Sequence, residues 1–322
     1  MTRLACLVLV IVAAAVFPLV ITNATATDIA VNAMIFVAAA SAWNIFSGYS
    51  GYLSLGHAVF FGTGVYTVGI AARDWNLAGD KVFALLPLAG LTAAVIAVPL
   101  GLIALRVRRH TFVVITIAFF FIAQLTATNL KSTGGSSGLL APVLNWTAST
   151  YNNPFYYAGL LIAAGTVLAS FLIRRSRFGL QLRALRDDED RAAGLGVRAM
   201  PVKLTAFTIS AFITGLAGGL WFYFLGQAFP QFAFDPLFDL AVALMAFFGG
   251  LGTIAGPVLG ALILEPAQLY LTLRITNDYL SEILLGVLFL VIILFLPRGV
   301  LPTAGEFLTA QRARLKERNR GR

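Results

Sequence analysis

The chain alternates between long apolar stretches and shorter polar ones, and most of its charges lie in the polar stretches. A transmembrane helix needs about 20 consecutive apolar residues. The pattern predicts ten apolar segments: 4–21, 29–46, 52–72, 83–105, 111–129, 155–173, 204–225, 237–250, 256–273 and 280–296. Because segment 52–72 is interrupted by glycines and segment 237–250 is short, we expect eight to ten membrane crossings. The predicted fold class is an all-α polytopic membrane protein.

The composition supports this class and sets an orientation. Hydrophobic residues make up 59% of the 322 residues and charged residues only 11%, against about 25% charged in soluble domains. The net charge of +9 comes from bases at the edges of apolar segments, which is the positive-inside pattern. It places both termini in the cytoplasm. No basic patch with interleaved aromatic residues indicates nucleic-acid binding.

The domain organisation predicted is one transmembrane domain over residues 1–296, followed by a basic cytoplasmic tail, 297–322. The first segment has two interpretations. Ala24 to Ala26 resembles the small-residue cleavage site of a signal peptide. The apolar run is longer than a typical signal sequence, which favours an uncleaved first helix.

The longest charged run is 174–203, and it separates the sixth and seventh apolar segments. Arg or Asp at the centre of a membrane helix costs about 2.5–3.5 kcal/mol, so this run is expected to face water. Residues 182–195 read as one short helix. Its expected ion pairs, at i,i+4 spacing, are Arg183 with Asp187, Arg186 with Asp190, and Asp187 with Arg191. Its expected apolar strip is Leu182, Leu185 and Ala192.

This helix also has two interpretations. Charge runs are usually solvated linkers. A small apolar strip among paired charges, midway along the chain at the membrane surface, also suits docking into a groove on a soluble partner. Gly196 offers a stop for the helix.

Two glycine-rich stretches interrupt the apolar pattern. The first, 48–57, reads GYSGYLSLGH, and glycines at this density allow a helix to break beside a solute pathway. Ser54, Gly56 and His57 are therefore pathway candidates. The alternative for His57 is a hydrogen bond between tightly packed helices.

The second stretch, 249–260, contributes four glycine candidates: Gly249, Gly250, Gly252 and Gly256. Pro257 suits the first turn of a new helix, so a chain reversal is expected just before it. Glu265 follows as a carboxylate inside an apolar segment, a default functional candidate, or a group paired inside the bundle.

Small residues recur every four positions in segment 204–225, at Ala211, Gly215 and Gly219, with Gly218 beside them. This spacing predicts a face on which another helix packs closely.

The sequence offers no catalytic chemistry. It contains no GxxxxGK[ST] phosphate loop, HExxH or CxxC. Its only histidines and cysteine are His57, His110 and Cys6, which makes a metal site built from them improbable. No catalytic residue, metal or cofactor is predicted, and the chain is not expected to be an enzyme.

Five motifs, in the same order as in a known family, cover nearly the whole chain after the second segment. They are GYLSLGHAVFFGTGVYT at 51–67, TGGSSGL at 133–139, SRFGLQLRALRDDEDRAAGLGV at 176–197, GGLGTIAGPVLGA at 249–261, and PRGVL at 297–301. With these motifs the sequence resembles the membrane permease subunits of branched-chain amino acid ABC importers, of the LivM type.

The resemblance implies a bacterial inner-membrane complex. The expected partners are a second permease subunit, two cytoplasmic ATP-binding subunits, an extracytoplasmic solute-binding protein at 133–139, and membrane lipid. The ATPase subunits would grip the stretch 183–196. The residues expected to couple are Arg183, Arg186, Asp187, Asp190, Arg191, Gly194 and Gly196. ATP would be hydrolysed by the partners, so this chain would bind no cofactor.

The resemblance leaves the solute open. The run Asp187 to Asp190 is more acidic than expected for the family. Tyr49 and Tyr52 flank Gly51, where the family more often has small or aliphatic residues. Urea or short amides therefore remain alternatives to branched-chain amino acids. Two rival hypotheses come from other classes of protein. One is an ion-coupled secondary transporter that uses Glu265, and the other is a channel or structural subunit. Reversing Arg183 and Arg186 to Glu is expected to uncouple transport while the protein stays in the membrane.

Overall fold

The computed structural model describes residues 14–21, 23–141, 151–274 and 299–303, with the single positions 283, 286, 287 and 290. Most of the first predicted segment and of the last lies outside these residues. The basic tail lies outside them from residue 304 onward.

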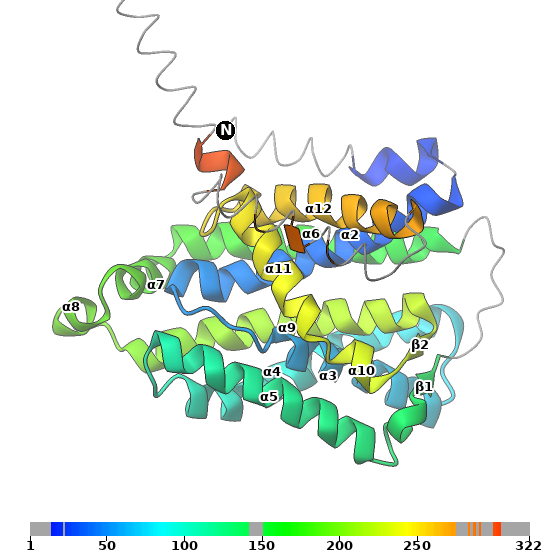
Figure 1. Cartoon of the computed structure of the whole chain (residues 1–322), viewed down its shortest axis with the longest axis horizontal. Helices are drawn as coiled ribbons and strands as arrows, with labels where there is room; N and C mark the ends of the chain where they lie inside the picture. Colours follow the sequence, from blue (N-terminus) through cyan, green and yellow to red (C-terminus); the bar gives the residue numbers. More distant parts are fainter. Residues whose placement is uncertain are drawn as a thin grey trace, which may run out of the picture.

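The described chain is almost entirely helical (Figure 1). The long helices are α2 (Ala24–Trp43), α3 (His57–Asp74), α4 (Leu86–Ala104), α5 (Arg109–Asn129), α6 (Asn152–Arg175), α9 (Ala199–Leu225), α11 (Pro236–Gly249) and α12 (Ala255–Arg274). The short helices are η1 (Asn44–Gly48), η2 (Gly79–Leu85), η3 (Gly135–Ser137), α7 (Arg177–Asp187), α8 (Glu189–Gly194) and α10 (Pro230–Ala233). Two short strands, β1 (Leu139–Leu140) and β2 (Gln227–Ala228), pair antiparallel, with Leu139 opposite Ala228.

Six helical segments among the described residues are long and apolar enough to cross a membrane. They are Ala24–Gly48, Gly79–Ala104, Arg109–Asn129, Asn152–Arg175, Ala199–Leu225 and Pro230–Gly249. The expectation of an all-α polytopic membrane protein is therefore confirmed. Helices form here because an apolar environment leaves backbone groups no partner except one another.

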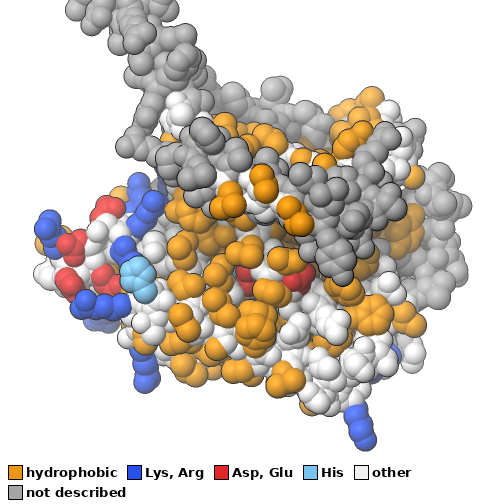
Figure 2. Space-filling model, viewed as in Figure 1, with side chains coloured by type: hydrophobic (Ala, Val, Ile, Leu, Met, Phe, Trp, Pro, Cys, Tyr) orange, Lys and Arg blue, Asp and Glu red, His pale blue; other side chains and the backbone are white. Residues whose placement is uncertain are grey.

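The long helices run between two ends of the molecule (Figure 1). We call the end that carries α7 and α8, within the charged run 174–203, the loop end. The opposite end, with β1 and β2, is the β end. Charged side chains gather over α7 and α8, whereas hydrophobic side chains cover most of the rest of the face seen in Figure 2. Apolar side chains on α5 and α6, such as Leu125 and Leu161, stay exposed, as expected of surfaces that meet lipid.

The small-residue face of α9 packs as its spacing predicts. Ala211 is fully buried. A Cβ added at Gly215 would lie 2.6 Å from the carbonyl oxygen of Ala89, and one at Gly219 would lie 2.8 Å from a methyl group of Val68. The absent side chains allow α9 to approach the backbones of α3 and α4.

Two predicted boundaries were wrong. Helix α9 begins at Ala199, so Lys203, counted with the water-facing loop, lies inside a helix and is buried. Helix α3 begins at His57 and not at residue 52. Polar contacts, described below, set the first residue of both helices, and the apolar pattern does not record them.

Candidate functional site

The first glycine-rich break is a non-helical stretch held inside the bundle. It follows the π-helical turn η1 and runs from Gly51, at φ +73°, to Gly56. The backbone amide of Ser54 donates to the Ser47 hydroxyl (3.2 Å), and the indole of Trp43 donates to the carbonyl of Ser54 (2.8 Å). Buried backbone groups need such partners. Local side chains therefore compensate for the lost helix.

His57 joins this break to two other helices. Its Nδ1 lies 2.9 Å from the Ser54 hydroxyl and its Nε2 lies 2.7 Å from the Ser210 hydroxyl on α9. The Ser210 hydroxyl also donates to the carbonyl of Ala42 on α2 (2.6 Å). His57 is fully buried, and both ring nitrogens are engaged. This geometry favours the interhelical interpretation of His57, whose role in a pathway stays a prediction.

Asp239 is a buried residue that sequence reasoning missed. It lies in the first turn of α11, and its Oδ1 accepts a hydrogen bond from the amide of Ala58 (3.1 Å) in the first turn of α3. The N-cap of α3, Gly56, has no side chain to do this, and a carboxylate there also complements the helix dipole. The available signal was an acid inside an apolar segment.

The second break lies directly beside the first. The side chain of Asn44 in η1 donates to the carbonyl of Thr253 and accepts from the amide of Gly252, both at 2.8 Å. Gly252 has φ +76°, where side chains are disfavoured. The chain reverses there and α12 begins at Ala255, so the predicted reversal before Pro257 is confirmed.

Arg186 of the charged loop touches both breaks. Its Nη1 donates to the carbonyl of Gly48 (2.7 Å). Its side chain fills the space beside two glycines: a Cβ at Gly51 would lie 2.9 Å from Arg186 Cγ, and one at Gly252 would meet the guanidinium. We call Gly48, Gly51, Gly252 and Arg186 the glycine junction. It connects α7 physically with the two helix breaks.

Arg109, at the start of α5, holds the end of α7 in place. Its guanidinium donates to the carbonyls of Leu185 (3.0 Å) and Arg186 (2.6 Å). These belong to the last turn of α7, where carbonyls lack helical partners and positive charge is favoured.

The loop is two helices and not the single one predicted for 182–195. Asp188 separates α7 from α8 and caps α8 by accepting from the amide of Arg191 (3.0 Å). None of the three expected i,i+4 ion pairs is present in the described loop. The pairs formed are Arg191 with Asp188 (2.9 Å) and Lys203 with Glu189 (2.6 Å). Aspartate is a strong N-cap, and this preference divides the helix.

The predicted apolar strip faces inward. Leu182, Leu185 and Ala192 are buried against the rest of the chain. Leu195 is 86% exposed at the tip of the loop, and Leu180 is 58% exposed. The exposed residues that sequence analysis assigned to coupling are Asp187, Asp190, Arg191, Gly194 and Gly196. Any partner at the loop end would contact these exposed residues and not the buried apolar strip.

A partly buried ion pair forms a second link between the loop and the first break. Glu189 of α8 accepts from Lys203 (2.6 Å) and from the hydroxyl of Tyr52 (2.5 Å), and Lys203 also donates to that hydroxyl (3.0 Å). Burial alone would raise the pKa of Glu189, but the hydrogen bonds from Lys203 and Tyr52 and the charges of Lys203 and Arg109 outweigh it and lower this pKa. We call Tyr52, Glu189 and Lys203 the lysine cluster.

The structure thus brings most of the predicted site residues together at the loop end. Arg183 bonds within its own loop, to the carbonyls of Gly179 and Arg174. Gly249 and Gly256 contact each other across the second break. Glu265 lies about three turns along α12, buried, with Oε2 lacking a hydrogen-bond partner among the described residues.

These features define a polytopic α-helical membrane protein in which a charged loop is joined to two helix breaks. The chain belongs to the family described as "Branched-chain amino acid transport system / permease component", which matches residues 25–293. The resemblance drawn from the five motifs is confirmed.

The chain is similar to several transport permeases. It is 30% identical to the high-affinity branched-chain amino acid transport system permease protein LivM of Escherichia coli (strain K12), over 92% of this chain and 74% of that protein. It is 30% identical to LivH of Salmonella typhimurium over 41% of this chain and 42% of that protein. It is 28% identical to the fructose import permease protein FrcC of Rhizobium meliloti over 44% and 40%, respectively. No solved structure matches the chain.

Proposed function

We propose that this chain is the membrane-spanning permease subunit of an ATP-binding-cassette importer that moves branched-chain or related hydrophobic amino acids into the cytoplasm. In this proposal the complex lies in the bacterial plasma (inner) membrane. A second permease subunit completes the pathway, two cytoplasmic ATPase subunits bind the loop end, and a solute-binding protein delivers solute to the β end. Both termini face the cytoplasm. The chain binds no nucleotide.

The glycine junction is the observation that carries this proposal. An ATPase that moves α7 and α8 also moves Arg186, whose guanidinium holds Gly48 and lies against Gly252. Helix breaks are places where a membrane helix changes direction at low cost. The mechanism is alternating access driven by ATP in the partner subunits. No covalent chemistry takes place in this chain.

The solute class follows the family and the likeness to LivM over 92% of this chain. Urea or a short amide is the alternative solute, and FrcC, to which part of the chain is similar, is named a fructose import permease.

An ion-coupled secondary transporter is the second candidate function. Asp239 and Glu265 are both buried carboxylates with one oxygen lacking a partner in the described chain. Uptake by the purified chain alone, in vesicles without ATP, would support this second candidate.

Replacing Leu195 by Asp tests whether the loop end binds ATPase subunits. Leu195 is 86% exposed, so the substitution leaves the fold intact. A carboxylate in a desolvated contact is expected to reduce ATPase retention about tenfold, equivalent to about 1.4 kcal/mol. The measurement is the amount of ATPase polypeptide that co-purifies in mild detergent, together with amino acid uptake.

Leu140→Asp is the matched control, because Leu140 is 76% exposed at the β end. It is expected to retain the ATPase subunits in full. Equal retention by the Leu195 and Leu140 variants at equal expression would refute the proposed docking. The double reversal of Arg183 and Arg186 to Glu is also expected to abolish uptake, but it is less specific because Arg186 holds Gly48.

A further inference from the structure

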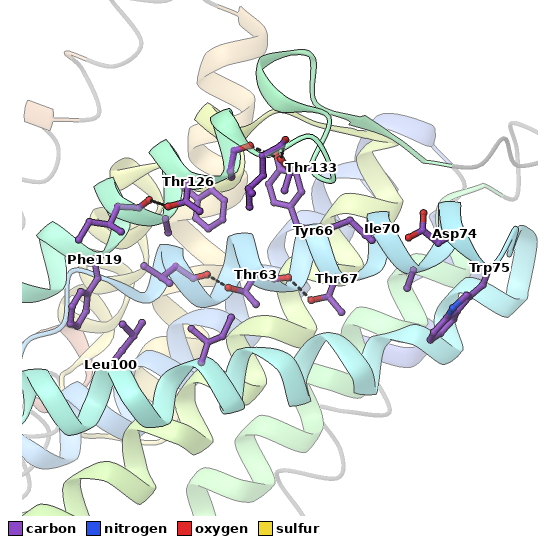
Figure 3. Close-up of a pocket in the computed structure, with 18 residues that line it drawn as sticks. Thr63, Tyr66, Thr67, Ile70, Asp74, Trp75, Leu100, Phe119, Thr126 and Thr133 are labelled. Atoms are coloured by element: carbon purple, nitrogen blue, oxygen red, sulfur yellow. Dashed lines mark hydrogen bonds between the residues drawn. The ribbon is translucent and has the colours of Figure 1, made fainter.

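A groove of about 570 Å³ opens between α3, α4 and α5. Figure 3 shows α3 forming its floor, with Thr63, Thr67 and Asp74 spaced along one side of that helix. Its walls are mostly apolar side chains such as Leu100 and Phe119. None of the predicted pathway candidates lines it.

One buried polar group in the groove has no hydrogen-bond partner among the residues that the structure describes. Tyr66 is only 5% exposed, its ring stacks on Phe234 with centroids 5.8 Å apart, and its hydroxyl makes no hydrogen bond within the described chain. The neighbouring threonines differ: Thr63 and Thr67 donate to helical carbonyls. An unmade hydrogen bond on a buried hydroxyl is costly, so Tyr66 is the group in this groove that would gain from a ligand.

The groove reaches the β end. Asp74, Trp75 and Leu130 line it there, and Thr133 belongs to the motif 133–139, the surface assigned to the solute-binding protein. Asp74 is paired with Arg73 at 2.8 Å and stays exposed. A solute delivered to this end would find the opening without crossing the rest of the bundle.

Two other cavities in the described part lack this combination. One of about 990 Å³ lies between α4, α6 and α9, and one of about 310 Å³ lies beside the first break. Among the described residues, the side-chain atoms that are buried without a hydrogen-bond partner belong to Ser41, Tyr66, Asp239 and Glu265. Only Tyr66 lines any of these three cavities.

We infer that the groove between α3, α4 and α5 binds the transported solute, and that Tyr66 provides the hydrogen bond that orients it. This inference rests on the proposed function and deepens it. The apolar walls select a solute with a hydrophobic side chain, and the Tyr66 hydroxyl meets its polar head. Among the described residues, Asp74 at the mouth is the only charged side chain that lines the groove, so a solute without net charge fits. The volume lies in the range of small-molecule sites, about 300–1,000 Å³.

The floor helix also explains how transport would move the site. Helix α3 begins directly after the first break, and Gly51 at the other end of that break lies against Arg186. A shift of α7 therefore acts on the helix that carries Thr63, Tyr66 and Thr67.

Cysteine labelling tests the site without ATP, so its outcome is independent of the ATPase test at Leu195. In a Cys6→Ser background, Thr67→Cys is placed in the full complex in membrane vesicles and treated with a water-soluble maleimide. The thiol is expected to react, and saturating leucine is expected to slow the reaction at least fivefold. Thr208→Cys is the matched control, because Thr208 lines the 990 Å³ cavity and is partly exposed like Thr67; its labelling is expected to be unaffected by leucine.

A thiol at position 67 that reacts only with a lipid-soluble maleimide would show that the groove faces acyl chains, and would overturn the inference. Labelling that leucine does not slow would also overturn it. Protection by urea and not by leucine would overturn the assigned solute class.

Tyr66→Phe tests the hydrogen bond, because it removes one hydroxyl and keeps the ring. Leucine uptake at low concentration is expected to fall about tenfold through a higher KM, with unchanged expression and ATPase retention. Tyr157→Phe on α6 is the matched control, because Tyr157 is 40% exposed and does not line the groove, and it is expected to transport normally. An unchanged KM for Tyr66→Phe would refute the role of the hydroxyl.

Discussion

Replacing Glu189 by Ala is expected to destabilise the protein by about 3 kcal/mol, the cost of leaving one partner of a buried ion pair uncompensated. The side chain of Lys203 is only 4% exposed, and Glu189 is its one carboxylate partner in the described chain. Without Glu189 the ammonium keeps a single acceptor, the Tyr52 hydroxyl. The measurement is the midpoint of thermal unfolding in mild detergent.

The two partners of this pair are not equivalent. The side chain of Glu189 is 32% exposed, so Lys203→Met leaves a carboxylate that water still reaches. We expect Lys203→Met to cost less than half as much as Glu189→Ala. The double variant Glu189→Met with Lys203→Met is expected to be more stable than Glu189→Ala alone, because it buries no unpaired charge. Equal midpoints for both single variants would show that burial does not set this asymmetry.

The same cluster predicts a dependence on pH. Its partners lower the pKa of Glu189 below the ordinary value of 4.5. A group whose folded-state pKa is lowered contributes its stabilisation above the unfolded-state pKa and loses it as the pH falls through the folded-state value. The midpoint difference between wild type and Glu189→Gln is therefore expected to be full at pH 7 and to shrink below about pH 4.5. A difference that persists unchanged at pH 3 would contradict this.

Leucine at Gly218 is expected to prevent folding altogether. A Cβ at this position would collide with the carbonyl oxygen of Phe61 on α3 and lie 2.8 Å from its carbon. Backbone cannot rotate aside as a flexible side chain can, so α3 and α9 would have to separate along the surface where they pack. Overpacking costs about 1–3 kcal/mol even where side chains adjust, and more is expected here. The measurement is the yield of monodisperse protein from membranes.

Gly165→Leu on α6 is the matched control. It changes the same residue in the same way within a membrane helix, but a Cβ there meets nothing within 4 Å. Its yield is expected to match wild type. Normal yield of Gly218→Leu would mean that the contact between α3 and α9 tolerates a side chain.

The hydrophobic pattern predicted the helices because membrane insertion depends on local properties of the chain. Segments 29–46, 83–105, 111–129 and 155–173 each lie inside an observed helical span, or extend one residue beyond it: Ala24–Gly48, Gly79–Ala104, Arg109–Asn129 and Asn152–Arg175. The pattern failed where a polar side chain intervened. Asp188 divided the predicted loop helix, and the pairing of Lys203 with Glu189 allowed α9 to start inside the charged run.

The sequence by itself therefore determined the class, six of the ten predicted membrane segments, the two glycine-rich breaks and the family, since length, hydropathy and motif order are properties of neighbouring residues. Only the tertiary structure showed what holds the breaks. Arg186 reaches Gly48 across 138 residues, Asp239 caps α3 across 181, and Asn44 binds Thr253 across 209. A hydrogen bond needs two groups within about 3 Å, and no local pattern records which distant segments the fold brings that close.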